Sequence, residues 1–371
     1  MKIPFLDLKS QYTEYKESAL SAVMQVMDEQ SFVLGSHVAS FEQDLGNYLN
    51  LPAAVGVSSG TDALLIALMT LNIGPGDEVV IPALSFFATA GVVARLGARP
   101  IFADINPDTF NLESNELKAV LNHRTKVVIP VHLFGQIARL DQWYQQNPED
   151  RPWIIEDAAQ ALGATLHGRG TGHLGDLACT SFFPTKNLGG FGDGGAVYGR
   201  DQQLLNRVRM LRVHGAQKKY HHTAIGGNFR LDAIQAAVLT VKLNHLQRWN
   251  QARQANAAWY NEFFANAQID PPLLRMPIPS NESTHIYHQY VIRSTRRDQL
   301  KERLKKAGID TMIYYPSPLH LQPCFSELGY RKGQLPEAER ACEEVLALPV
   351  HPTLRLDQRE YIAEQVCLAL R

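Results

Sequence analysis

A single lysine, Lys186, stands between an apolar run and a glycine-rich run in the segment SFFPTKNLGGFGDGG, residues 181–195. Asp193 is the only other charged residue in that segment. An unpaired buried ammonium is costly, so a lysine in such surroundings either extends its amine to water or uses it in chemistry. A neutral lysine amine is a nucleophile toward carbonyl groups. Lys186 is therefore the first candidate for a catalytic residue.

A second candidate site is the stretch GVSSGTDALLIAL, residues 56–68, which follows a predicted strand and opens a predicted helix. The free N–H groups of residues 59–62 would suit a phosphate at the positive end of that helix. Ordinary N-capping by serine or threonine explains the same residues equally well. The stretch also fits G-x-S-x-G, the nucleophile turn of serine hydrolases, with Ser58 as the nucleophile. That alternative leaves Lys186 without a role, and it places the nucleophile turn earlier in the chain than the serine-hydrolase fold normally does.

A third candidate is the strand PWIIEDAAQ, residues 152–160, which ends with Glu156 and Asp157. Successive strand residues point to opposite faces, so one carboxylate faces the ligand-bearing end of the sheet and the other faces away. A structural ion pair is the usual role of such a carboxylate. Taken together, a phosphate cradle, a carboxylate and a lysine amine match the needs of pyridoxal phosphate: an anchor, a partner for the pyridine nitrogen and an amine for the aldehyde.

The glycine-rich run GFGDGG, Gly190–Gly195, also matches the dinucleotide pattern G-x-G-x-x-G. It leads into the predicted strand GAVYG and opens no helix, so we do not expect a dinucleotide site there. These glycines instead allow tight turns and a close backbone approach beside Lys186.

The elements that must position these residues are those of an α/β protein. Short apolar runs alternate with helical stretches through the first two hundred residues, which predicts a mostly parallel sheet between helices. From Leu231 to Ala267 there is neither Gly nor Pro, which predicts one long helix or two nearly continuous ones. After a Pro-rich stretch we expect the strand HIYHQYVIR, the helix RRDQLKERLKKAG, the strand TMIYYP and two closing helices. The predicted domains are a large cofactor-binding α/β domain, residues 1–250, and a small α+β domain, residues 251–371.

The overall composition narrows the class of protein. The chain has 371 residues, 45% of them hydrophobic, with 36 basic and 37 acidic side chains. This balance favours neither nucleic acid nor a membrane surface as a partner. The four cysteines show no paired spacing, which predicts reduced thiols, a cytoplasmic location and no metal site. The longest apolar run is far shorter than the ~18 residues of a membrane span, so we expect a soluble protein.

Four motifs together carry a resemblance to a known family. SSGTDAL, EDAAQ, SFFPTKNLG and GGNFRLDAIQAA occur in this order, at spacings similar to those of the DegT/StrS sugar aminotransferases. These are fold type I pyridoxal-phosphate enzymes, and the resemblance extends over essentially the whole chain. The resemblance implies that fold, that cofactor and a homodimer whose active sites are shared between subunits.

The resemblance also implies roles for individual residues. Lys186 resembles the lysine that binds the cofactor aldehyde, and Asp157 resembles the aspartate that faces the pyridine nitrogen. The remaining cofactor contacts that it implies are the phosphate contacts Gly60, Thr61 and Ser181, the ring-hydroxyl partner Gln160, the stacking residue Phe86 with Phe87 as the alternative, and Asn228, which would reach a phosphate across the dimer interface.

The implied reaction is transamination, because the branch of the family that dehydrates sugars has histidine in place of Lys186. L-glutamate would be the amino donor. The acceptor would be a hexose linked to a nucleoside diphosphate, with a ketone at C3 or C4, and a 3-keto uronate belongs to this group. The product would be an amino sugar for a surface polysaccharide such as lipopolysaccharide O-antigen, for another glycan or for a secondary metabolite.

Substrate contacts are expected in the most basic stretch of the chain, residues 207–222. Lys218, Lys219 and Tyr220 are the candidates there for holding the diphosphate, although a solvated helix face explains the first half of the stretch. His320 resembles a family position near the sugar. The neighbouring histidines His221 and His222 have no carboxylate or cysteine at ligand spacing, so a metal is not expected.

Two functions of other classes remain as alternatives. One is a serine hydrolase that uses Ser58. The other is a regulatory or nucleic-acid-binding protein that keeps the fold without catalysis.

Overall fold

A computed structural model describes residues 1–146 and 151–371 of the chain. Among these residues, seven strands form a central sheet, and their runs are apolar because helices cover both faces. The β9 strand runs antiparallel to both of its neighbours, and the other adjacent pairs are parallel. In spatial order the strands are β1 (Ala53–Val57), β9 (Gly195–Gly199), β8 (Leu177–Ser181), β5 (Trp153–Asp157), β4 (Thr125–Val128), β2 (Glu78–Pro82) and β3 (Arg99–Ala103). The predicted α/β fold with a mostly parallel sheet is confirmed.

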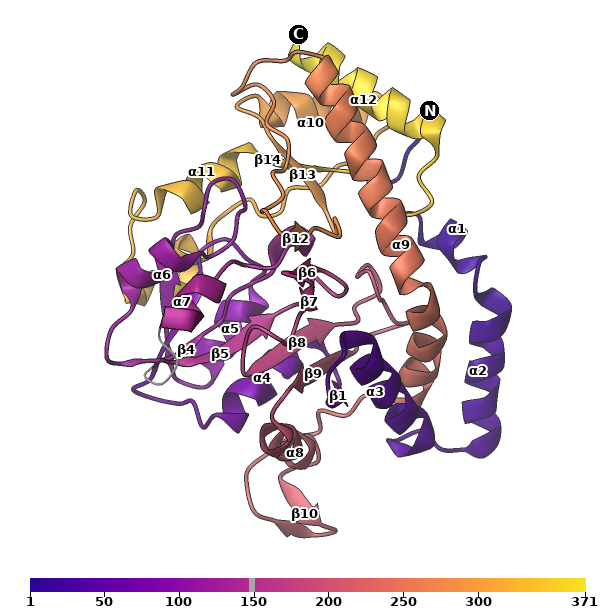
Figure 1. Ribbon diagram of the computed structural model, residues 1–371, viewed down its shortest axis with the longest axis vertical. Coiled ribbons are helices and arrows are strands. Elements are labelled where there is room, and N and C mark those ends of the chain that lie inside the picture. Colours follow the sequence, from indigo (N-terminus) through magenta and orange to yellow (C-terminus); the bar gives the residue numbers. More distant parts are fainter. Residues whose placement is uncertain (147–150) are drawn as a thin grey trace.

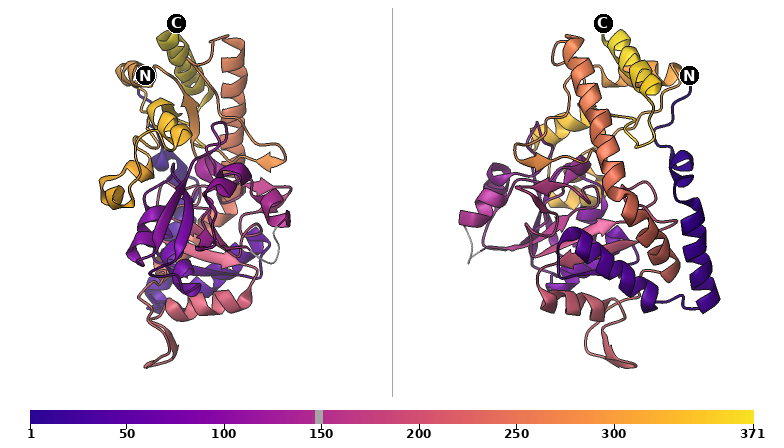
Figure 2. Two further views of the ribbon diagram at one scale, coloured as in Figure 1. Left: turned by 90° about the vertical axis from the view of Figure 1, so that its left-hand side faces the viewer. Right: turned by 45° about the vertical axis from the view of Figure 1, so that its right-hand side comes forward.

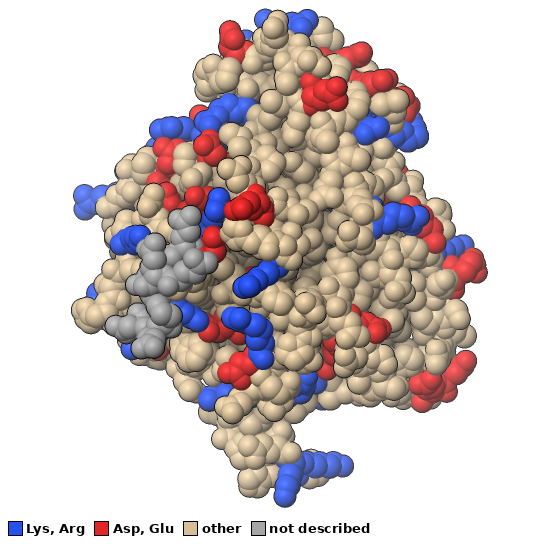
Figure 3. All heavy atoms as spheres, in the orientation of Figure 1, with Lys and Arg blue, Asp and Glu red and all other residues tan. Residues whose placement is uncertain are grey.

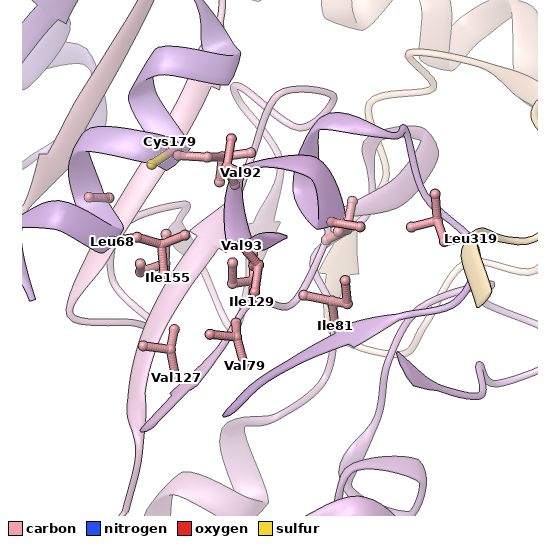
Figure 4. Packing of buried hydrophobic residues seen from close by; sticks show 14 of the residues in the cluster. Leu68, Val79, Ile81, Val92, Val93, Val127, Ile129, Ile155, Cys179 and Leu319 are labelled. Carbon is pink, nitrogen blue, oxygen red and sulfur yellow. The ribbon is translucent and has the colours of Figure 1, made fainter. Parts of the chain in front are cut away.

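Helices pack on both faces of this sheet (Figure 1). On one face, aliphatic side chains from helices and strands pack together, among them Leu68, Val93, Ile81, Ile129 and Ile155 (Figure 4). The helices on that face are α4 (Gly60–Thr70), α5 (Ala88–Arg95) and α8 (Gln202–Leu211), and those on the other are α3 (Gly35–Leu49) and the first half of α9 (Ala233–Asn266). The helices α6 (Ser114–Val120) and α7 (Asp141–Gln146) also cover this second face, where Leu117 and Trp143 pack with Val80, Val128 and Ile154. The helices α1 (Leu8–Tyr12) and α2 (Lys16–Glu29) lie outside this core, and α2 packs along α9.

The long helix α9 links the sheet to the C-terminal part of the chain, as the two rotated views also show (Figure 2). There a second core forms around Tyr260, Ile292 and Leu346, and it includes Ile3 from the N-terminus. Its elements are β13 (Tyr290–Arg293), α10 (Arg297–Lys306), β14 (Val345–Leu348) and α12 (Leu356–Leu370), whereas α11 (Pro336–Glu344) packs against the core of the large sheet. Residue 250 lies inside α9, so the helix is continuous through the predicted boundary, and the division at that residue stays a prediction.

Two of the predicted C-terminal strands differ from the structure. HIYHQYVIR is a strand only from Tyr290, because Ile286 and Gln289 donate their N–H groups to carbonyls of Gly135 and Phe134. TMIYYP forms a single bridge, between Met312 and Ala347. The pairing partner of β13 is instead β14, which the sequence patterns did not reveal.

Short strands complete the fold. The strands β12 (Ser283–Thr284), β6 (Thr165–Leu166) and β7 (Arg169–Gly170) form a small sheet, and β10 (Ala216–Lys218) pairs with β11 (His221–His222) in a hairpin. This hairpin projects from the body beyond α8 (Figures 1 and 2). Within the described residues, no helix is both long and apolar enough to cross a membrane.

Candidate active site

A cavity of about 440 Å³ lies at the carboxyl ends of β5 and β8, beside the N-terminus of α4. The C-terminal part of the chain closes one side of it. The lining residues are Ser59, Gly60, Thr61, Leu64, Ser85, Phe86, Ala88, Val131, Asp157, Ala159, Gln160, Ser181, Phe183, Thr185, Lys186, Asp193, His288, Gln289, Tyr314 and Tyr315. Seven of the residues predicted to hold the cofactor are therefore brought together: Gly60, Thr61, Phe86, Asp157, Gln160, Ser181 and Lys186.

Lys186 lies in a tight turn after β8, where its backbone N–H donates to the carbonyl of Phe183 at 2.8 Å. Burial among protein atoms lowers the pKa of Lys186 to about 8, although the nearby charge of Asp157 acts to raise it. A lysine with such a pKa supplies a neutral amine near physiological pH. Lys186 lines the cavity, which explains why a lysine is tolerated in this apolar and glycine-rich segment.

Asp157 ends β5 and is held from two sides. Thr89 Oγ1 donates to its Oδ2 at 2.8 Å, and the N–H of Ala159 donates to its Oδ1 at 3.2 Å. Since Thr89 gives its hydrogen to Asp157, Ser85 must donate to Thr89 across their 3.0 Å contact. Desolvation raises the pKa of Asp157, so a cationic group in the cavity would favour its charged form.

Glu156 points to the opposite side of the sheet, as strand alternation predicts. Its carboxylate accepts N–H groups from Gly172, Leu174 and Gly175 and bonds His132 Nε2 at 2.8 Å. These partners hold the pKa of Glu156 below its usual value against the opposing effect of burial. Glu156 therefore organises the loop after β7, and Asp157 is the carboxylate of the cavity.

The N-terminus of α4 forms the predicted cradle. Ser59 caps the helix by accepting the N–H of Asp62 at 3.0 Å. A Cβ atom on Gly60 would lie 2.5 Å from the Cβ of Ser181, and one on Gly195 would lie 2.5 Å from the backbone of Ser59. Glycine is required at both positions because the helix start packs directly on β8 and β9. Helix N–H groups and two hydroxyls then face the cavity at one end.

Two further predicted residues lie on the cavity wall. Phe86 lines the cavity, whereas Phe87 stacks on Phe325 with ring centroids 5.8 Å apart. Of the two phenylalanines, Phe86 is thus the one available to a ligand. Gln160 also lines the cavity, but its amide already bonds the N–H of Phe134 and the hydroxyl of Tyr315.

The hydroxyl of Ser58 donates to Asp62 at 2.6 Å. In the described part of the chain its hydrogen bond thus goes to a carboxylate, and Ser58 does not line the cavity. In a serine hydrolase the nucleophilic hydroxyl instead donates to a general base, most often a histidine. The geometry does not support Ser58 as a nucleophile.

Asn228, Lys218, Lys219 and Tyr220 are not brought to the cavity of their own chain. Lys218 and the exposed Tyr220 belong to the projecting hairpin of β10 and β11 (Figure 1). The space-filling view shows Lys and Arg atoms at the tip of this projection (Figure 3). A ligand in the cavity of this chain would therefore not contact these residues.

His320 does not lie on the cavity wall either. Its side chain is fully buried and faces Glu339 at 3.2 Å, between the rings of Phe102 and Tyr330. In this structure it cannot contact a sugar in the cavity, because the chain turns in a short 3-10 segment at residues 319–321 and directs the ring into the core.

Sequence reasoning missed Thr89, His288, Gln289, Tyr314 and Tyr315. Thr89 is one helical turn after Phe86, but nothing in the sequence pairs it with Asp157. The other four residues reach the cavity only because distant parts of the chain pack together. The pair of tyrosines in TMIYYP was a signal, since a proline argues against a central strand and a buried tyrosine hydroxyl needs a hydrogen-bond partner.

The donor set fits pyridoxal phosphate on structural grounds. A helix N-terminus with two neighbouring hydroxyls suits the phosphate. Asp157, buried with two donors, offers an oxygen to a pyridine N–H, and Lys186 offers an amine of lowered pKa. Within the described residues, no group of three or more His, Cys, Asp and Glu could hold a metal ion. Fold and cavity together define an aminotransferase of the pyridoxal-phosphate class.

A family model for the DegT/DnrJ/EryC1/StrS aminotransferase family matches residues 13–367, and the chain belongs to this family. Three relatives span nearly the whole chain. A pleiotropic regulatory protein of Geobacillus stearothermophilus is 45% identical and covers 99% of this chain and 98% of its own. A dTDP-3-amino-3,4,6-trideoxy-alpha-D-glucose transaminase of Streptomyces venezuelae is 39% identical, with 98% and 95% covered. A UDP-2-acetamido-2-deoxy-3-oxo-D-glucuronate aminotransferase of Pseudomonas aeruginosa is 38% identical, with 95% and 96% covered.

Two solved structures have the same fold. The Streptomyces venezuelae DesV structure has a TM-score of 0.96 and 39% identity, and the match covers 100% of this chain and 99% of that one. The ntda structure from Bacillus subtilis, with bound cofactor PMP, has a TM-score of 0.91 and 30% identity, with 100% and 85% covered. The family expected from the four motifs is confirmed.

Proposed function

We propose that this chain is a pyridoxal-phosphate aminotransferase that moves an amino group from L-glutamate to a keto sugar linked to a nucleoside diphosphate. The observation that carries the proposal is the pairing of Lys186, with its pKa of about 8, and the buried Asp157 in one cavity. The family membership and the named transaminases among its relatives support the class of substrate.

The cofactor supplies an electron sink for the carbanion that forms when a proton leaves the substrate carbon. Asp157 would keep the pyridine nitrogen protonated by offering it a negative charge. The amine of Lys186 takes the proton from one carbon and returns it to another, which needs the neutral form that burial favours. Gly60, Thr61 and Ser181 would hold the phosphate, and Phe86 would cover the ring.

We further propose a homodimer with shared active sites. The cavity of one chain is lined by one cation, Lys186, among the described residues, whereas the substrates carry carboxylates and a diphosphate. Lys218, Lys219 and Asn228, which lie away from their own cavity, would supply the missing positive and polar groups to the partner's cavity. Exposed apolar side chains on and after α2, namely Leu20, Met24, Met27, Phe32 and Val33, are suited to such an interface.

The acceptor that we propose carries its ketone at C3 or C4, and a 3-keto uronate remains within the class. The two named relatives differ in nucleotide, dTDP in one and UDP in the other, and both names place the reacting nitrogen or ketone at C3. The amino sugar would serve the synthesis of lipopolysaccharide O-antigen or of another glycan or metabolite. The four cysteines are free, which supports a cytoplasmic location.

The relative named as a regulatory protein favours one alternative, a regulator of the same fold. A protein without catalysis would have no need for a desolvated lysine beside a buried carboxylate, because each is costly to bury. The variant Lys186→Ala distinguishes the two functions. A regulatory activity would survive that substitution, and transamination would not.

The test of the proposed function is a two-step assay. Glutamate alone should bleach the visible absorbance of the cofactor-loaded enzyme in a single turnover. A panel of dTDP- and UDP-linked 3-keto and 4-keto hexoses, generated from their precursors, should then restore the absorbance, and mass spectrometry should find the aminated sugar. An enzyme that binds no cofactor, or whose absorbance glutamate leaves unchanged, would contradict the proposal.

A further inference from the structure

The amide of Gln160 has a fixed orientation. Its Oε1 accepts the backbone N–H of Phe134 at 2.8 Å, and its Nε2 lies 3.2 Å from the hydroxyl of Tyr315. A backbone N–H can only donate, so Phe134 determines which end of the amide is the oxygen. The other end is the NH₂ group, and Gln160 must therefore donate to Tyr315.

The hydroxyl of Tyr315 consequently acts as an acceptor toward Gln160 and keeps its own hydrogen. Across the described residues, the hydrogen bond of this hydroxyl is the one that it accepts. Burial, with a smaller effect of the Asp157 charge, raises the pKa of Tyr315, so the hydroxyl stays protonated at neutral pH. A phenol that already accepts has one hydrogen to give.

Tyr315 lies where that hydrogen can reach a ligand. It lines the cavity together with Asp157 and Lys186, and its ring centroid is 6.3 Å from that of Phe86. A donor with a fixed direction beside a charged group is the arrangement that stabilises charge on a ligand oxygen.

We propose that Tyr315 is a fixed hydrogen-bond donor of the active site, that Gln160 is the residue that positions it, and that it donates to a ligand oxygen held beside Asp157. The inference rests on the proposed function, because that oxygen belongs either to the cofactor ring or to the ketone of the sugar. Gln160, which the sequence assigned to the ring hydroxyl, then acts mainly through Tyr315.

Two substitutions of nearly unchanged shape test this proposal. Tyr315→Phe removes the hydroxyl. Gln160→Glu replaces the donating amide with a carboxylate, which accepts from both Phe134 and Tyr315 and so turns the tyrosine hydrogen away from the cavity. Tyr361→Phe is the matched control, since it removes a hydroxyl that donates to the carbonyl of Ala307, remote from the cavity.

The first measurement is the pH titration of the visible absorbance of the holoenzyme without substrate. If Tyr315 donates to the cofactor ring, it stabilises negative charge on the ring oxygen. Its loss should then raise the midpoint by about one pH unit, the effect of a hydrogen bond to a charged group. Gln160→Glu should shift the midpoint in the same direction, the double variant should shift it no further, and Tyr361→Phe should leave it unchanged.

The second measurement separates the two half-reactions. If the acceptor is the ketone oxygen, the absorbance midpoint and the glutamate step stay unchanged, and amination of the sugar slows by about 10- to 100-fold in both variants. The proposal is overturned if Tyr315→Phe changes neither the midpoint nor either half-reaction. It is also overturned if Gln160→Glu does not produce the same change as Tyr315→Phe. A wild-type enzyme that binds no cofactor would overturn the proposed function and this inference together, whereas an active wild type with unchanged variants overturns only the inference.

Discussion

At the scale of single residues, the proposed chemistry depends on the charge state of Lys186. Burial disfavours the charged form of its amine and lowers its pKa, and the negative charge of Asp157 partly offsets this effect. The balance leaves a lysine that is neutral in about half of the molecules near pH 8. A lysine in water would reach this state only near pH 10.4.

This balance predicts the pH dependence with which the cofactor-free enzyme takes up pyridoxal phosphate. Only the neutral amine reacts, so the rate constant should rise about tenfold per pH unit below pH 8 and level off above it. Stopped-flow absorbance measures this rate. In Asp157→Asn the charge that raises the pKa of Lys186 is absent, so the midpoint should move to lower pH. A rate that keeps rising up to pH 10 would show that the amine is solvated.

At the scale of elements, the start of α4 is placed by its contact with β8 and β9. Gly195 allows the backbone of Ser59 to approach β9, and any Cβ there would overlap it at 2.5 Å. Gly195→Ala must therefore displace the cradle of N–H groups. We expect a dissociation constant for the cofactor at least about tenfold higher and a stability loss of about 1–3 kcal/mol. Equilibrium dialysis and calorimetry measure the two effects.

Gly170→Ala is the control for this change, because a Cβ at position 170 has its nearest contact at 3.9 Å. It should leave both the cofactor affinity and the melting temperature unchanged. Equal effects of the two substitutions would mean that the close approach of α4 to β9 does not set the geometry of the cradle.

Glu156 tests how the loop after β7 is held. It accepts three backbone N–H groups, and Glu156→Gln would leave at least one of these donors unpaired in a buried site. The expected loss is about 3 kcal/mol, seen as a lower melting temperature of the holoenzyme. Because the pKa of Glu156 is lowered in the folded state, its stabilising effect is present above the unfolded pKa near 4.3 and is lost as the pH falls through the folded value. An unchanged melting temperature at pH 7 would contradict this role.

At the scale of the whole molecule, the projecting hairpin and Asn228 lie outside their own cavity, which predicts complementation between subunits. Homodimers of Lys186→Ala and of Asn228→Asp should both lose activity. Mixed dimers formed on co-expression contain one site with both residues intact, so about one quarter of the wild-type activity should return. The assay is the glutamate half-reaction on purified mixtures. If the mixtures stay inactive, each cavity is complete within one chain.

The sequence could predict the parts of the site that lie close together along the chain. Lys186 with Ser181, and Asp157 with Gln160, sit in short motifs at the ends of strands, where the pattern of the α/β fold already places ligands. Tyr315 and His288 could not be found in this way, because they reach the cavity only through the packing of the C-terminal part against the sheet. The role of His320 near the sugar stays a prediction, and in this structure a local turn that the pattern does not reveal directs its ring into the core.

The large sheet was predictable because apolar runs of β-branched residues need cover on both faces. The small second pairing of β13 with β14 was not, since VLAL follows a helix without any turn signal and could extend that helix equally well.

Borohydride reduction of the cofactor-loaded enzyme, followed by peptide mass spectrometry, identifies the side chain that binds the cofactor. Lys242 is an internal control, because burial also lowers its pKa to about 8 while aromatic rings, Tyr15 among them, surround its amine outside the cavity. We predict that the reduced cofactor is attached to Lys186 and that Lys242 is unmodified. An unmodified Lys186, or a cofactor attached to Lys242, would contradict the account.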